Sequence, residues 1–275
     1  MKLLDMSVQY AKDVISGKEL APEEVKIQCE WFLRDLERQY EQDYHYFFSE
    51  AHLKVVENLL KIMNFATGLN VTGKPILYGL HPFQAFFITN IFAWRFKEDE
   101  FRFKHRDITM FIPRKNAKTF LASVIMLILL MTEDEFSEFY SICLDRELAS
   151  EVKKAMAQII SASPAIKKYF TVPKSLNGKL VCKLTNSFYQ PRTASANNNN
   201  AIRPSAFIAD EVGAFTSYAN ISAMKSGELS VRNPLRFNLT TAYSEDKSIM
   251  LQNLEYIKKV YQEIIEDDRQ FALLY

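Results

Sequence analysis

From residue 81 onward, short apolar stretches alternate with helical stretches, and this alternation limits the possible folds more than any other feature of the sequence. The predicted strands lie at 108–112, 139–144, 206–209 and 235–240, and the predicted helices at 82–95, from 118, at 146–160, 218–229 and 247–265. Strands that are separated by helices form a parallel sheet covered on both faces. We therefore predict an α/β fold with a mainly parallel central sheet flanked by helices.

The organisation outside this alternating region is predicted from helical spacing and from breaks. Apolar residues at helical spacing predict helices at 11–15, 23–40 and 47–65, and glycines punctuate 68–79. We expect an N-terminal helical subdomain at 1–70, an α/β core at 71–245 and a C-terminal linker helix at 246–275. Glu266, Asp267 and Asp268 are interpreted as a solvated face of that helical tail. The segment 176–179 is typical of a hairpin, and Asn197–Asn200 of an exposed loop tip.

Composition excludes several classes of protein. The chain has 275 residues, 48% of them hydrophobic, and a net charge of +1, which argues against disorder and against a statically bound, strongly basic DNA-binding protein. Three distant cysteines and four unpatterned histidines predict neither disulfides nor zinc, and they fit a reducing cytoplasm. The longest apolar run, 120–131, is well short of the ~20 residues of a membrane span, and no signal peptide is evident.

The segment from Ile112 to Thr119 (IPRKNAKT) joins a predicted strand to a predicted helix. In a phosphate-binding loop, backbone N–H groups and a helix N-terminus face the phosphates, a lysine reaches the β- and γ-phosphates, and a threonine ligates Mg²⁺. Lys118 and Thr119 have that spacing. Ile112 and Ala117 replace the two glycines of the usual pattern, so the octamer alone favours a basic strand-to-helix turn on the surface over a phosphate-binding loop.

Two acids follow the predicted strand at 206–209. A strand that ends in Asp210 and Glu211 is typical of the second half of a P-loop ATPase site: the first acid holds the Mg²⁺ shell, and the second orients the attacking water. Acid pairs also occur in ordinary loops. The carboxyl ends of parallel strands meet at one edge of a sheet, however, so we expect this pair beside Lys118.

Two further segments carry groups of interest. Asn238–Ser244 places small hydroxyl residues at a strand end, where they can reach a γ-phosphate; an ordinary β-branched strand end is the alternative. Gln84, near a predicted helix start, has an amide that both donates and accepts hydrogen bonds, as the edge of adenine requires; a solvent-exposed glutamine is the alternative.

Taken in order, these motifs resemble the large terminase family of tailed phages. The resemblance extends to Tyr10–Val14 with Ser16-Gly17, to Phe32–Leu36, and to Phe139–Ser141 with Arg146–Ala149, and so covers nearly the whole chain. It implies an ASCE-type P-loop NTPase fold. It also implies a nuclease domain, which we expect to be absent from this chain, whether removed or present on another chain.

The resemblance also implies roles for individual residues. ATP would be bound by Gln84 and by the loop residues Arg114, Lys115, Asn116, Ala117, Lys118 and Thr119. Arg114 would touch the γ-phosphate, Glu211 would be the catalytic carboxylate, and Thr119 and Asp210 would hold Mg²⁺. Thr240, Thr241 and Ala242 would couple hydrolysis to movement. Arg203 and Arg192 are candidates for an arginine that acts on a neighbouring subunit, or are plain surface arginines.

The predicted function is therefore an ATPase motor that drives double-stranded viral DNA into the procapsid in the host cytoplasm. The resemblance implies ATP and Mg²⁺ as cofactors, and as partners the portal protein, the small terminase subunit and further copies of this chain in a ring, with no membrane. Two alternatives stay open: a helicase-like nucleic-acid translocase, and a non-enzymatic assembly protein whose ATP site has decayed.

Overall fold

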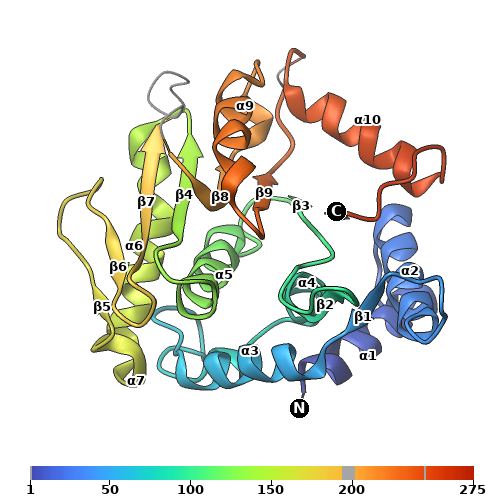
Figure 1. Cartoon of the computed structure of the whole chain (residues 1–275), viewed down its shortest axis with the longest axis horizontal. Coiled ribbons are helices and arrows are strands. Elements are labelled where there is room, and N and C mark those ends of the chain that lie inside the picture. The colour runs from blue at the N-terminus through green and yellow to red at the C-terminus, as the bar shows by residue number, and fades with distance from the viewer. Residues whose placement is uncertain (1, 194–201, 245) are drawn as a thin grey trace.

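A computed structural model describes residues 2–193, 202–244 and 246–275, and its centre is an eight-stranded sheet (Figure 1). The strand order across the sheet is β10-β3-β9-β8-β4-β7-β6-β5. The strands are β3 (Asp107–Phe111), β4 (Glu138–Cys143), β5 (Phe170–Thr171), β6 (Leu180–Cys182), β7 (Ser187–Thr193), β8 (Pro204–Asp210), β9 (Leu235–Thr240) and β10 (Gln270–Leu274). Asn197–Asn200 lie outside the described residues.

Neighbouring strands from β10 to β7 are all parallel, and the two antiparallel pairings of this sheet, β7 with β6 and β6 with β5, lie at one edge. The prediction of a mainly parallel sheet is thus confirmed. The predicted turn at 176–179 lies within the connection between β5 and β6, which pair as a hairpin. β7, which pairs with both β4 and β6, was not predicted.

Two layers of helices cover the sheet, and the alternation of side chains along β8 shows how. Ala206 and Ile208 belong to the core cluster that contains α5 (Lys118–Thr132) and α6 (Arg146–Ala162). Phe207 and Ala209 belong to the cluster under α9 (Ala219–Ser226) and the start of α10 (Ile249–Tyr261). Successive residues of a strand point to opposite faces, so α5 and α9 cover opposite faces.

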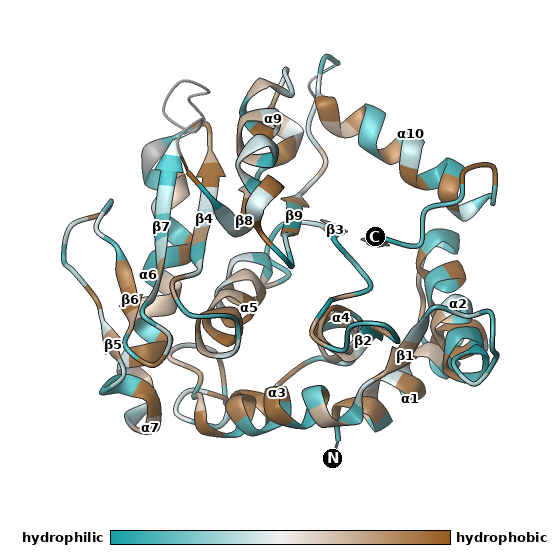
Figure 2. Ribbon diagram, in the orientation of Figure 1, coloured by the Kyte–Doolittle hydropathy of each residue, from teal (hydrophilic) through white to brown (hydrophobic). Residues whose placement is uncertain are grey.

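Two helices are apolar on nearly every side because they are buried within the molecule. In α4 (Pro82–Ala93), the residues from Gln84 to Ala93 are all buried, as are those from Leu121 to Leu130 in α5. Figure 2 shows brown, hydrophobic residues along both helices. A helix without a polar face is stable in water only when other elements surround it. No helix in the described part of the chain is both long and apolar enough to cross a membrane.

The N-terminal helices pack directly against the sheet-bearing part. These helices are α1 (Leu3–Ile15), α2 (Glu23–Arg38) and α3 (Glu50–Ile62). α1 packs against α4, where the Ser7 and Thr89 hydroxyls hydrogen-bond at 2.8 Å, and α2 packs against β10. All three contribute to the main core. The boundary of a helical subdomain near residue 70 stays a prediction.

The predicted linker helix at 246–275 is wrong in its last part. α10 ends at Tyr261, and Gln270–Leu274 form β10, which pairs in parallel with β3. Every residue of β10 is buried, because a strand of a covered parallel sheet is enclosed on both faces. Sequence reasoning also missed the small antiparallel pair of β1 (Tyr46–Phe48) and β2 (Trp94–Phe96), because the predicted helices at 47–65 and 82–95 overlap both strands.

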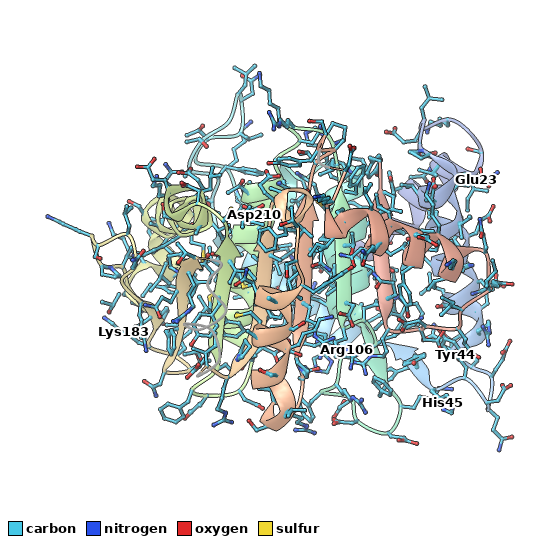
Figure 3. All side chains as sticks on the ribbon, turned by 90° about the horizontal axis from the view of Figure 1, so that it is seen from above. Glu23, Tyr44, His45, Arg106, Lys183 and Asp210 are labelled. Carbon is cyan, nitrogen blue, oxygen red and sulfur yellow. The ribbon has the colours of Figure 1, made fainter. Side chains whose placement is uncertain are left out.

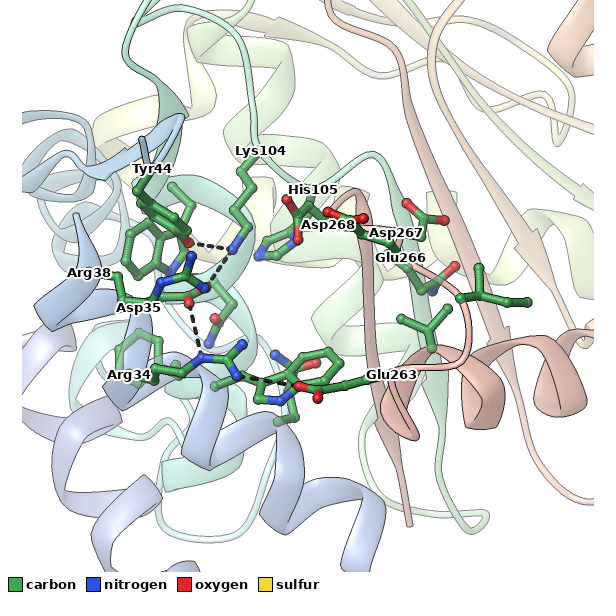
Figure 4. Close-up of a pocket in the computed structure, with 18 residues that line it drawn as sticks. Arg34, Asp35, Arg38, Tyr44, Lys104, His105, Glu263, Glu266, Asp267 and Asp268 are labelled. Atoms are coloured by element: carbon green, nitrogen blue, oxygen red, sulfur yellow. Dashed lines mark hydrogen bonds and ion pairs between the residues drawn. The ribbon is translucent and has the colours of Figure 1, made fainter. Parts of the chain in front are cut away.

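The acids Glu266, Asp267 and Asp268 are likewise not helical, since they lie between α10 and β10. They border a cavity of about 320 Å³ beside α2 (Figure 4). In its wall the Lys104 ammonium lies 2.6 Å from an Asp35 carboxylate oxygen and 3.0 Å from the Tyr44 hydroxyl. This buried ion pair joins α2 to the segment that precedes β3.

Candidate nucleotide-binding site

The loop between β3 and α5 has an unusual backbone. Lys115 and Ala117 have φ values of 69° and 59°, in the left-handed region that non-glycine residues rarely adopt. The Asn116 side chain donates to the carbonyl of Pro113 at 3.0 Å, and the Ile112 amide donates to the carbonyl of Thr240 on β9 at 3.1 Å. The loop therefore turns tightly into the N-terminus of α5, whose first N–H groups form a favourable place for an anion.

Lys118, the first residue of α5, contacts both acids of the predicted pair. Its Nζ lies 2.5 Å from Oε1 of Glu211 and 3.3 Å from Oδ1 of Asp210, and only 10% of the side chain is exposed. The three residues are brought together because β3 and β8 both end at the same edge of the sheet, with β9 between them. The juxtaposition expected from the sequence is therefore present.

Burial affects the protonation of Asp210, the first acid of the pair. Desolvation of Asp210 raises the pKa of its carboxyl, the neighbouring Glu211 raises it further, and Lys118 opposes both effects. Glu211 follows directly with φ 57°, a left-handed turn at the end of β8. Its Oε2 is buried and has no hydrogen-bond partner among the described residues. A carboxyl oxygen in that position can accept a hydrogen bond from water or another donor.

The side chains of Thr119 and Asp210 have the chemistry that a magnesium ion requires. Mg²⁺ is a hard cation that prefers oxygen ligands and usually takes one or two carboxylates from the protein together with phosphates and waters. Thr119 supplies a hydroxyl at the second position of α5, and Asp210 supplies a carboxylate at the end of β8. The oxygen-only chemistry of this donor set matches that preference.

The segment predicted to couple the site to movement connects directly to the residues after Glu211. The Gly213 amide donates to Oγ1 of Thr240 at 2.9 Å, and that hydroxyl donates to the carbonyl of Thr241 at 3.0 Å. A Cβ atom on Gly213 would lie 2.8 Å from Oγ1 of Thr240, so this approach requires glycine. Oγ1 of Thr241 is buried without a partner among the described residues, while Ala242 is exposed.

Tyr243 belongs to the same site, although sequence reasoning assigned it no role. The Arg114 guanidinium carbon lies 5.9 Å from the centre of its ring, a cation–π distance. Burial and the nearby charge of Glu211 raise the pKa of the Tyr243 hydroxyl, whereas Arg114 lowers it. The signal in the sequence was its position two residues beyond Thr241.

Gln84 lies in the first turn of α4, which is linked through Tyr275 to the end of β3, the strand that leads into the loop 112–119. The Phe83 ring packs 5.8 Å from that of Tyr275, whose amide donates to the carbonyl of Phe111 at the end of β3. Gln84 itself is buried, and its Oε1 accepts from the His81 amide at 3.0 Å. That oxygen thus caps the helix, and recognition of adenine by Gln84 stays a prediction.

The two candidate arginines occupy different parts of the sheet. Arg203 immediately precedes β8, so it lies at the opposite edge from Asp210, and its guanidinium donates to the Ser230 hydroxyl at 3.0 Å. Figure 3 shows the separation of the two edges by the positions of Asp210 and Arg106. Arg192 lies on β7, 5.6 Å from the Tyr140 ring. Action of either arginine on a neighbouring subunit stays a prediction.

Comparison with protein families identifies the family to which this arrangement belongs. The model of the terminase large subunit ATPase domain matches residues 82–259, which is more than half of the chain. The chain belongs to this family. The terminase ATPase assignment agrees with the topology, because a strand (β9) separates the loop strand from the acid strand, as in ASCE-type P-loop ATPases. A search of curated proteins finds no match.

Solved structures of phage terminases resemble this terminase domain. The large terminase of bacteriophage HK97 matches with a TM-score of 0.65 and 21% identity, over 81% of this chain and 43% of that chain. The large terminase of a thermophilic bacteriophage gives 0.46 and 11%, over 62% and 40%. The ATPase domain of the large terminase of a Thermus phage gives 0.43 and 16%, over 51% and 61%. The first match establishes a shared fold, and the chain spans less than half of the HK97 protein.

Proposed function

We propose that this domain hydrolyses ATP, with Mg²⁺, at the site formed by the loop 112–119 and the acids Asp210 and Glu211. The observation that carries the proposal is the contact of the Lys118 ammonium with both carboxylates. A lysine held at a helix N-terminus can exchange carboxylate oxygens for phosphate oxygens, since both are anionic acceptors. Membership of the terminase ATPase family supports ATP as the nucleotide.

The side chains would divide the work by position. Lys118 would bind the β- and γ-phosphates, and Arg114, exposed on the loop, would reach the γ-phosphate. Thr119 and Asp210 would hold Mg²⁺, which when bound neutralises charge on the phosphates. Glu211 would use its unpartnered Oε2 to accept a hydrogen bond from the attacking water and orient it.

A conformational change at Glu211 would be transmitted to the segment that contains Thr240 and Thr241. Because Gly213 is hydrogen-bonded to Thr240, a shift of Glu211 changes the position of the strand end that carries Thr240 and Thr241. We propose that this shift drives double-stranded viral DNA into a procapsid in the host cytoplasm. The domain would work as part of a ring of identical subunits on the portal protein, with the small terminase subunit, and one arginine, Arg192 or Arg203, would act across the subunit boundary.

The test separates binding from hydrolysis. Glu211→Gln keeps the size of the side chain and removes its charge, so it should still bind ATP while hydrolysis falls by about 10²–10⁴-fold, the range for loss of a general base. Lys118→Ala should abolish the ATP-dependent rise in melting temperature that wild type shows. Glu135→Gln, an exposed acid outside the site, is the matched control and should retain both activities.

Two results would contradict the proposal. Undiminished hydrolysis in Glu211→Gln would remove this residue from the catalytic role. A wild-type chain whose melting temperature does not respond to ATP and Mg²⁺, or a Lys118→Ala variant that responds like wild type, would favour the non-enzymatic assembly protein. Strand displacement on a forked duplex would instead favour a helicase-like translocase.

A further inference from the structure

Charge is distributed unevenly along this chain. Residues 152–209 contain none of the 33 Asp and Glu residues, but they contain nine of the 34 Lys and Arg residues. The net charge of the whole chain, +1, therefore conceals one strongly basic stretch in a protein that is otherwise acidic. A strongly basic, acid-free surface is the electrostatic feature expected of a protein that contacts nucleic-acid phosphates.

Most of these cations gather on one structural unit, the hairpin of β5 and β6 with the residues that flank it. It lies at the edge of the sheet opposite β10, and in Figure 3 Lys183 is on the side of the molecule away from Glu23. Five exposed lysines, which we call the hairpin lysines, lie on this unit: Lys167, Lys168, Lys174, Lys179 and Lys183.

The hairpin lysines are available to an external anion. In the described part of the chain, none of the five forms an ion pair with an acid, whereas Lys54 and Lys154, for example, pair with glutamates on their own helices. The contacts of the hairpin lysines are weak ones. Lys179 lies 3.8 Å from the centre of the Phe188 ring, and Lys183 donates to the carbonyl of Lys168 at 3.4 Å.

A sixth lysine of the same stretch fixes the shape of the hairpin loop. Lys153 on α6 is buried, and its ammonium donates to the carbonyls of Pro173, Ser175 and Leu176 at 3.4, 2.5 and 3.4 Å. The Gln190 side chain donates to the carbonyl of Asn177 at 2.9 Å. The loop that carries Lys174 and Lys179 is thus held in place before any partner arrives, which lowers the entropy cost of binding.

We propose that the hairpin lysines bind the phosphate backbone of duplex DNA. This inference rests on the proposed function in its choice of partner, because a packaging motor acts on duplex DNA. Contacts of lysine with phosphates carry no sequence information, as the transport of a whole genome requires. Five exposed cations also give binding that is weak and salt-dependent, so the protein can release one phosphate and take the next.

The experiment measures how the affinity of the full 275-residue chain for a fluorescent duplex of arbitrary sequence depends on salt, without nucleotide. The triple variant K174Q/K179Q/K183Q should lower the slope of log affinity against log salt by about 2.7, at ~0.9 for each phosphate contact. Between roughly 50 and 200 mM salt, its loss of affinity should therefore be about 40-fold smaller than that of wild type.

Two controls match the triple variant. K2Q/K12Q/K74Q removes the same charge from exposed lysines elsewhere and should keep the wild-type slope. K174R/K179R/K183R keeps the charge and should keep the slope as well. The melting temperatures of all three variants should stay close to wild type, because the replaced side chains are exposed.

An equal effect of the two glutamine triples, an unchanged slope in K174Q/K179Q/K183Q, or no salt-dependent duplex binding by wild type would each overturn the proposal. After either of the last two results, an acidic partner other than duplex DNA would be the next candidate to test for the hairpin lysines. None of these measurements involves ATP, so failure here is distinguishable from failure of the proposed hydrolysis, which the Glu211→Gln assay addresses.

Discussion

Replacing Ala117 by glycine should stabilise the folded state of the loop between β3 and α5 and raise its affinity for ATP. Ala117 has φ 59° and ψ 28°, a left-handed conformation in which the Cβ of an L-residue crowds the following carbonyl, at a cost of about 1–2 kcal/mol. Glycine has no Cβ and loses this cost. It also makes the unfolded chain more flexible, which offsets about 0.4–1 kcal/mol. The folded state should therefore gain about 0.5–1 kcal/mol.

Thermal unfolding and nucleotide titration measure the two consequences. Without nucleotide, Ala117→Gly should raise the melting temperature by about 1–4 °C for a chain of this size. With ATP and Mg²⁺, the Kd should fall about 2–5-fold, because glycine has no methyl group to crowd a phosphate bound in the loop. Ala117→Val should act in the opposite direction on both, since a β-branched residue adopts the left-handed region least readily.

Asn70→Gly supplies the control. Asn70 also has a positive φ, 62°, but asparagine tolerates this region better than alanine, and the residue is an exposed one in the 68–79 connector. Its replacement should change stability little and ATP affinity not at all. The reasoning would be refuted by an Ala117→Gly variant that melts below wild type, or by glycine and valine variants of equal affinity.

Two predictions concern stability away from the site. Burial raises the pKa of Glu133 to about 7, so its protonated form stabilises the fold below pH 4.5 and this contribution is lost as the pH rises through 7. In urea unfolding, the free energy of unfolding of Glu133→Gln should equal that of wild type at about pH 4 and exceed it by about 1 kcal/mol at about pH 8. This difference is smaller than the pKa shift alone would give, because the side chain is partly exposed to solvent. Lys104→Met leaves the buried Asp35 with only its longer ion pair to Arg34, at 3.7 Å, and should cost about 3 kcal/mol in the same assay, the lower end of the range for breaking a buried pair. The double variant K104M/D35N should recover much of this loss, and equal losses in the single and double variants would contradict the pairing.

The sequence predicts the elements whose apolar residues form a long or clearly bounded stretch that is buried in the structure. The helix from Lys118 and the strand at 206–209 lie in long apolar or sharply bounded stretches, and their order along the chain places Lys118 and the acid pair at one edge of the sheet. β10 was missed because Phe271–Leu274 is too short to distinguish a strand from a helix end, and its partner β3 lies about 160 residues earlier in the chain.

The site was predicted less completely than the fold, for a related reason. Spacing within a motif identifies Lys118, Asp210 and Glu211, but a contact between separate loops leaves no periodic signal. Tyr243 beside Arg114 and the Gly213–Thr240 hydrogen bond are of this kind. The left-handed backbone of Ala117 is also invisible in a sequence, because glycine, the residue that would mark it, is the one replaced.

Tyr275 offers a place from which to observe the phosphate loop. Its amide donates to the carbonyl of Phe111, the last residue of β3, and its hydroxyl is hydrogen-bonded to that of Tyr10 on α1. A spectroscopic probe on this side chain would lie just beyond β10 and beside the end of β3, the strand that leads into Ile112 and the proposed nucleotide site. A movement of β3 during ATP hydrolysis would reach the probe through the hydrogen bond between the Tyr275 amide and the Phe111 carbonyl. The proposed site itself would then need no label.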